Sequence, residues 1–173
     1  VTFCAGHPVI VVTKKASHPA WLLFILAHEI GHLASGHLAE TEGGAIMDEK
    51  VAEDDPIDDD QEQVATRFAL ELLTGGVQKI RLDRLIQADA LAEAAKRHGT
   101  RHKIDPGHLI LNAVRNIEFR GAPPWNLANA ALKHVGHDDG SVEELCRAAL
   151  RDHVDLDVLT DDGFEFIERL GLI

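Results

Sequence analysis

The sequence predicts an α+β protein that is mainly helical, with one short sheet near its amino end. A run of four β-branched residues, Val9 to Val12, is the strongest strand signal. Beyond it, apolar residues recur every three or four positions through most of the chain, which is the spacing of one helix face. The 173 residues suffice for a real core, since a chain of this size buries roughly two thirds of its unfolded surface.

The first part of the chain predicts a strand followed by a long helix. The β-branched run is typical of a short buried strand. A helix is predicted from Ala20 to about His37. Ser17 is suited to be its N-cap, and Pro19 is suited to its first turn. Gly31 weakens this helix by about 1 kcal/mol relative to alanine, and Gly36 marks its end.

Residues 38–60 are crowded with acidic side chains and contain Gly43, Gly44 and Pro56. This composition predicts a solvated acidic loop. A calcium site is the alternative, but the spacing lacks the glycine that the usual calcium loop needs at its sixth position.

A second helix is predicted from about Asp60 to Thr74. Val64, Phe68 and Leu72 recur every four residues and predict one apolar face. The acidic residues at its start suit the positive end of the helix dipole. The Gly75–Gly76 pair ends it.

The rest of the chain predicts further helices. Ser141 and Glu144 have the spacing of a capping box. The apolar stripes of these helices would be exposed unless they packed on the first part. We therefore predict a core over residues 1–76 and a helical region over residues 77–173 packed on it, within one domain or two. The expected elements are a strand at Val77–Leu82 and helices at Arg84–Arg97, Asp105–Glu118, Asn126–His134, Ser141–His153 and from Asp161 or Asp162 onward.

Charge and composition exclude several classes of protein. The formal net charge of −12 argues against direct nucleic-acid binding, which is driven by neutralising phosphates. No apolar run reaches the roughly 18 residues that a membrane span needs, and the opening residues lack the pattern of a secretory signal. Cys4 and Cys146 lie far apart without CxxC spacing, so we expect a reducing, cytoplasmic compartment.

The sequence His28-Glu29-Ile30-Gly31-His32 is the strongest chemical signal. Residues four apart share one helix face, so His28 and His32 can present two imidazoles to one zinc ion. Glu29 can then act as the general base toward a water activated by that zinc, which is the chemistry of peptide hydrolysis.

A catalytic zinc site needs a third protein ligand. The pattern HExxHxxGxxH does not supply it, because Ser35 and Leu38 stand where the glycine and the histidine are required. Glu62 is favoured, because it lies in the first turn of an apolar helix that can pack beside the first one. Competing carboxylates remain: Asp48, Glu49, Asp58, Asp59 and Asp60.

Two motifs in order, HEIGHLASGH from His28 and EQVATRFALELL from Glu62, resemble the ImmA/IrrE zinc metallopeptidases. That family usually has an HELGH helix, often with a further histidine five residues on, and a helix reading E-x-x-A-N-x-F-A-x-x-L-L. The resemblance covers about residues 7–75. It implies a zincin-like fold for the core, with the β-branched run as the edge strand of the cleft.

The resemblance also implies the site and the activity. His28, His32 and Glu62 would hold one zinc ion per chain, with manganese or another divalent ion as the alternative, and Glu29 would be the catalytic base. The implied activity is an endopeptidase that cleaves a helix-turn-helix repressor or an antitoxin-like regulator, in a stress or mobile-element response. The acidic charge fits such a basic, DNA-binding protein substrate.

Two departures keep a second hypothesis open. Thr66 stands where the family usually has Asn or Asp, although its hydroxyl can still contact a ligand histidine, as can His37. The chain has no tyrosine, so the group that stabilises the oxyanion is unknown. The alternative is a catalytically degenerate zincin that acts as a protein-binding module or a toxin–antitoxin component. Histidines that qualify for the oxyanion role by residue type are His98, His102, His108, His134, His137 and His153.

Overall fold

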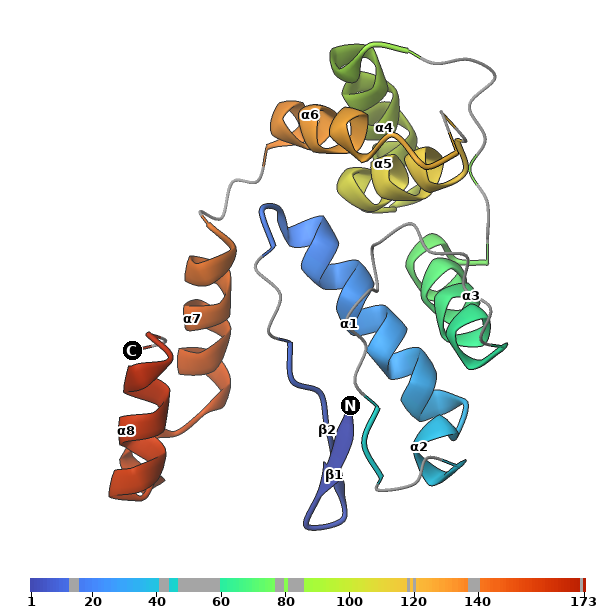
Figure 1. The fold of residues 1–173 in the computed structure, drawn as a ribbon. Helices are drawn as coiled ribbons and strands as arrows, with labels where there is room; N and C mark the ends of the chain where they lie inside the picture. Colours follow the sequence, from blue (N-terminus) through green and yellow to red (C-terminus); the bar gives the residue numbers. More distant parts are fainter. Residues whose placement is uncertain are drawn as a thin grey trace.

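The computed structural model describes residues 1–12, 16–40, 44–46, 60–76, 80, 86–117, 119, 121–136, 141–171 and 173. Within these residues the protein is mostly helical with a small two-stranded sheet, so the predicted α+β class is confirmed (Figure 1). The strands are β1 (Thr2–Cys4) and β2 (His7–Val9). The α-helices are α1 (Pro19–Ala34), α2 (His37–Glu40), α3 (Asp60–Thr74), α4 (Ala88–His102), α5 (Pro106–Arg115), α6 (Trp125–Val135), α7 (Val142–His153) and α8 (Asp161–Arg169), with a 3-10 turn, η1 (Leu156–Val158), before α8.

The sheet is an antiparallel hairpin at the amino end. Thr2 pairs with Val9, and the turn residues Ala5 and Gly6 both have positive φ, as a type I′ turn requires. The prediction of a buried strand through Val12 is wrong, since β2 ends at Val9 and Val11 is 67% exposed. The reason is pairing: β1 begins at Thr2, so no residue of β1 lies opposite the chain beyond Val9.

Helix α1 differs from its prediction at both ends. His18, not Ser17, is the N-cap, and its Nδ1 accepts a hydrogen bond from the Ala20 amide at 3.1 Å. The helix stops at Ala34 instead of His37 because Gly36 takes a φ of +77°, which breaks the helical path. A short second helix, α2, then begins.

The later helices follow their cap signals. Helix α3 has the predicted bounds, Asp105 caps α5 by accepting a hydrogen bond from the His108 amide, and the capping box of α7 forms as predicted. Helix α4 continues past its predicted end at Arg97 to His102. It ends there because the next residue, Lys103, takes a left-handed conformation with a φ of +57°. Helix α6 begins at Trp125, so Asn126 is not its cap.

Some predictions fall on residues that the structure does not describe. Most of the predicted acidic loop lies outside the described ranges, as do the start of the predicted helix at Arg84 and all of the predicted strand Val77–Leu82 except Ile80.

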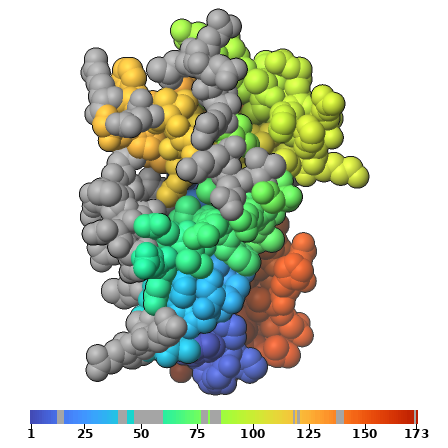
Figure 2. Space-filling model, turned by 90° about the vertical axis from the view of Figure 1, so that its right-hand side faces the viewer, coloured from blue at the N-terminus to red at the C-terminus, as the bar shows by residue number. Residues whose placement is uncertain are grey.

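The core lies where α1 meets the helices on either side of it. Helices α4, α5 and α6 form one buried cluster together with Ala20 of α1, and the ring of Trp21 lies edge-on to that of Trp125 at 5.2 Å. Phe24 and Ala27 of α1 pack on Ala69 and Leu70 of α3 in a second cluster. Figure 2 shows α3 in front, with α7 and α8 behind it.

Within the described part of the chain, no helix is both long and apolar enough to cross a membrane.

Candidate metal site

Helices α1 and α3 approach each other closely at Gly31. A Cβ added to Gly31 would lie 2.8 Å from the carbonyl oxygen and 2.9 Å from the Cα of Ala65. Both distances are shorter than contacts that real Cβ atoms make, so only glycine fits there. Gly31 lowers the intrinsic stability of α1, but it is also the residue that lets α3 pack closely against α1.

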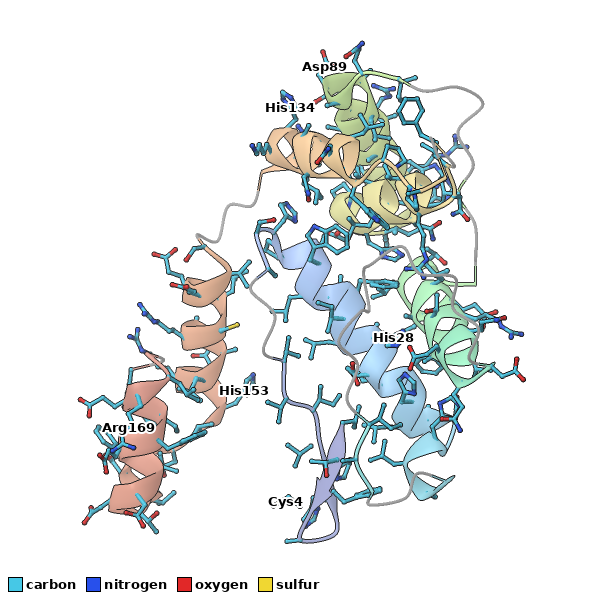
Figure 3. All side chains as sticks on the ribbon, in the orientation of Figure 1. Cys4, His28, Asp89, His134, His153 and Arg169 are labelled. Carbon is cyan, nitrogen blue, oxygen red and sulfur yellow. The ribbon has the colours of Figure 1, made fainter. Side chains whose placement is uncertain are left out.

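This close packing brings three metal-ligating side chains together. His28 and His32 lie one turn apart on α1, and Glu62 faces them from the first turn of α3. The two Nε2 atoms are 3.1 Å apart, and the carboxylate oxygens of Glu62 lie 3.0 Å from His28 Nε2 and 3.2 Å from His32 Nε2. Figure 3 shows His28 on the side of α1 that faces α3. The three residues form a group that could hold a metal ion.

The donor set fits a tetrahedral ion such as zinc. With ligand distances of about 2.0–2.1 Å, the donor atoms of a tetrahedral site lie about 3.3 Å from one another. The pairs measured here lie at 3.0–3.2 Å, with a different oxygen of Glu62 nearest to each histidine, so a small outward movement of the side chains would make room for an ion between them. The histidines are nearly fully buried, whereas the Glu62 side chain is 26% exposed, which leaves the site reachable from the Glu62 side.

The outer nitrogen of each histidine contacts a further side chain. His28 Nδ1 lies 3.3 Å from the Thr66 hydroxyl, and His32 Nδ1 lies 3.0 Å from His37 Nδ1. Such contacts hold each ring so that Nε2 points toward the ion. Thr66 and His37 therefore contact the two histidines on the side away from Glu62. Of the competing acidic residues, Asp60 is exposed at the start of α3, and the other four lie outside the described ranges.

Glu29 is buried beside the ligands on α1, with 7% of its surface exposed. Its Oε2 lies 3.7 Å from the main-chain nitrogen of Val1, which donates a hydrogen bond to the Ile46 carbonyl oxygen at 2.6 Å. The residue before β1 thus lies close to Glu29.

His108, a candidate for the oxyanion role by residue type, lies within a helix and is not exposed. It is fully buried in α5, and its ring is stacked on Phe24 at 6.4 Å between centroids. Neither ring nitrogen has a hydrogen-bond partner within the described part of the chain. Burial lowers the pKa of His108 from 6.5 to about 4, and the opposing effect of the Asp105 carboxylate is smaller.

The other histidines considered for the oxyanion role, where the structure describes them, are not gathered at His28, His32 and Glu62. His98 and His102 lie side by side, exposed, on α4, with ring centroids 4.2 Å apart. His134 and His153 are exposed at the ends of α6 and α7, and His137 is outside the described ranges.

Sequence reasoning missed the packing role of Gly31. The available signal was a glycine inside a strongly apolar helix, which commonly has a packing reason.

Comparison with protein-family models, with curated proteins and with solved structures finds no match.

Proposed function

We propose that this protein is a zinc-dependent endopeptidase whose first 76 residues form a zincin-like catalytic core. One observation carries the proposal: side chains from two helices, distant in sequence, converge to within 3.0–3.2 Å of one another with the donor set of a catalytic zinc site, and a buried glutamate directly follows the first ligand. Three protein ligands leave one coordination position for water or substrate, as a catalytic site requires.

The chain's own residues then have separate tasks. His28, His32 and Glu62 would hold the ion, while Thr66 and His37 orient the two imidazoles. A bound zinc ion supplies Lewis-acid chemistry, by which it polarises a peptide carbonyl and acidifies a water molecule. Glu29 accepts the proton of the attacking water at its carboxylate and delivers it to the departing amine nitrogen.

A basic, DNA-binding regulator is the substrate class that we propose. The resemblance of the two motifs to the ImmA/IrrE metallopeptidases supports it. The net charge of −12 supports it independently, since an acidic surface accelerates encounter with a basic protein.

The test begins with the metal content of the purified protein and of three variants. We expect about one zinc per chain in the parent, as three ligands and an open position imply. His32→Ala and Glu62→Ala should lose it. Glu29→Gln should keep both metal and fold, and should abolish cleavage when the proteins are incubated with a panel of purified helix-turn-helix regulators and the products are read by mass spectrometry.

Glu93→Gln is the matched control, because it makes the same chemical change at an exposed position on α4. It should keep metal and cleavage alike. Cleavage by Glu29→Gln at the parent rate would overturn the assignment of the base. Metal binding that persists in Glu62→Ala would place the third ligand elsewhere. A metal-loaded parent that binds a regulator and cleaves none of the panel would favour the non-catalytic binding module.

A further inference from the structure

Helices α7 and α8 stand apart from the core. None of the described residues in either helix is buried, and neither buried cluster contains a residue beyond Val135. Figure 1 shows the two helices side by side, on the opposite side of α1 from α3. Arg147 in the middle of α7 donates a hydrogen bond to the carbonyl oxygen of Gly171, just after α8, at 2.7 Å, which joins the two helices.

The pair leaves apolar side chains in solvent. Phe166 is 62% exposed, Leu170 is 56% exposed and Phe164 is 45% exposed, and Val158 in the connecting turn is 75% exposed. Burial of a phenylalanine or leucine side chain is worth about 1.5–3 kcal/mol, so these side chains together offer considerable binding energy. Isolated exposed apolar residues are ordinary on protein surfaces, but here four lie within thirteen residues of sequence.

The exposed residues belong to one wide stripe on α8. At 3.6 residues per turn, Phe166, Leu170, Ile167 and Phe164 cover an arc of about 160°. Ile167, near the middle of the arc, is half-buried, whereas the residues at both margins are exposed. One neighbouring helix is therefore too narrow to cover the stripe, and a third helix would complete a small bundle.

The charge around this surface decides what can cover it. Residues 141–173 contain nine acidic and three basic side chains, a net charge of −6, which is half of the −12 of the whole chain. Arg169 is paired with Glu165 on the same helix. A second copy of this chain, an anionic membrane or a nucleic acid would each bring like charge against it.

We propose that α7 and α8 form a docking surface for a basic amphipathic helix of another protein. The apolar stripe of that helix would cover Phe164, Phe166 and Leu170, and its lysine or arginine side chains would lie against the carboxylates of Asp162 and Glu168, which border the stripe. Helix-in-groove recognition of this kind uses apolar residues for affinity and surrounding charge for specificity and rate. The surface is distinct from the metal ligands, so the proposal does not depend on peptide hydrolysis.

The test measures binding of synthetic helical peptides to the full chain by isothermal titration calorimetry. The probe is an amphipathic peptide of leucine and lysine. One control peptide has the same pattern in leucine and glutamate, and another has the same composition as the probe in a scrambled order. We expect the probe to bind, the glutamate peptide not to bind, and the scrambled peptide to bind about tenfold more weakly or worse.

Variants distinguish this surface from general attraction to an acidic protein. Phe166→Ser with Leu170→Ser should weaken binding of the probe about tenfold or more, whereas Val11→Ser, at a similarly exposed apolar site outside the hairpin, should not change it. Asp162→Asn with Glu168→Gln should weaken binding and reduce its salt dependence. Circular dichroism checks that each variant keeps the parent's helix content.

Equal binding of the probe by parent and Phe166→Ser/Leu170→Ser would overturn the proposal. Sedimentation provides a separate check: a parent dimer that becomes monomeric in the same double variant would show that a second copy covers the surface, which would also overturn it.

Discussion

His32 and His37 meet through their Nδ1 atoms, 3.0 Å apart, in the interior beside the metal ligands. Only one of the two nitrogens can carry the shared proton. To bind an ion, His32 would need its Nε2 free of a proton, so it would donate from Nδ1 and His37 would accept. In the proposed site, His37 on the short helix α2 would then set both the tautomer and the orientation of the His32 ring.

Replacing His37 should therefore weaken metal binding without removing a ligand. We expect His37→Leu to lower zinc affinity about 10–100-fold, the usual effect of removing such a contact. His37→Gln, which keeps a hydrogen-bond acceptor, should recover part of the loss. Competition with a chromophoric chelator measures the affinity, and the visible spectrum of the cobalt-loaded protein reports the ligand geometry.

The matched control for His37 is His134→Leu, at an exposed position near the end of α6. It should leave both the affinity and the cobalt spectrum unchanged. If His37→Leu also leaves both unchanged, the His37 contact has no part in holding the ligand.

Gly31→Ala should destabilise the protein although alanine favours helix. The added Cβ would meet the backbone of Ala65 at 2.8–2.9 Å, and backbone cannot yield as a side-chain tip can. We expect a loss of about 1–3 kcal/mol in the free energy of unfolding, typical of overpacking, which outweighs the gain of about 1 kcal/mol in helix propensity. Urea denaturation measures it.

Gly163→Ala is the control for the glycine change. A Cβ at Gly163 in α8 would approach only the Thr160 and Leu159 side chains, at 3.3 Å or more. We expect its unfolding free energy to equal that of the parent or to exceed it slightly. A Gly31→Ala protein as stable as Gly163→Ala would mean that α1 and α3 pack less closely than the structure shows.

Stability should fall as the solution is acidified from pH 6.5 to about pH 4. His108 has a folded-state pKa near 4, below its unfolded value of 6.5. Within that window the unfolded chain binds the proton more readily, so folding stability is full above pH 6.5 and declines as the pH falls toward 4. The decline from this residue reaches about 3 kcal/mol at most.

The contribution of His108 is isolated by comparison with His108→Leu. Other groups titrate equally in both proteins, so the difference between their free energies of unfolding at each pH reports His108 alone. That difference should shift in favour of the variant as the pH falls through the window. A difference that stays constant from pH 7 to pH 4 would contradict the lowered pKa.

The parts of the fold that the sequence predicted well are those governed by local chemistry. Helix α3 has its predicted bounds because Asp60 and Gly75 mark the two ends of a regular apolar face. The proximity of His28, His32 and Glu62 follows from the spacing of the two histidines and from the place of Glu62 on the next apolar helix. Contacts distant in sequence decided the rest. The strand ends at Val9 because β1 has no residue left to pair with the chain beyond it. His108 is buried because α1 packs over it. Neither outcome can be predicted from the residues next to it in the sequence.

The placement of the ligands on two helices links metal occupancy to helix packing. His28 and His32 come from α1 and Glu62 from α3, and the chain between these helices is long. A bound ion would therefore cross-link two helices that also meet at Gly31 and in the buried cluster of Phe24, Ala27, Ala69 and Leu70. A bound ion would stabilise the association of α1 and α3 by a certain free energy. By thermodynamic reciprocity, that association strengthens the binding of the ion by the same free energy. Metal affinity is therefore a measure of how firmly the two helices are held together.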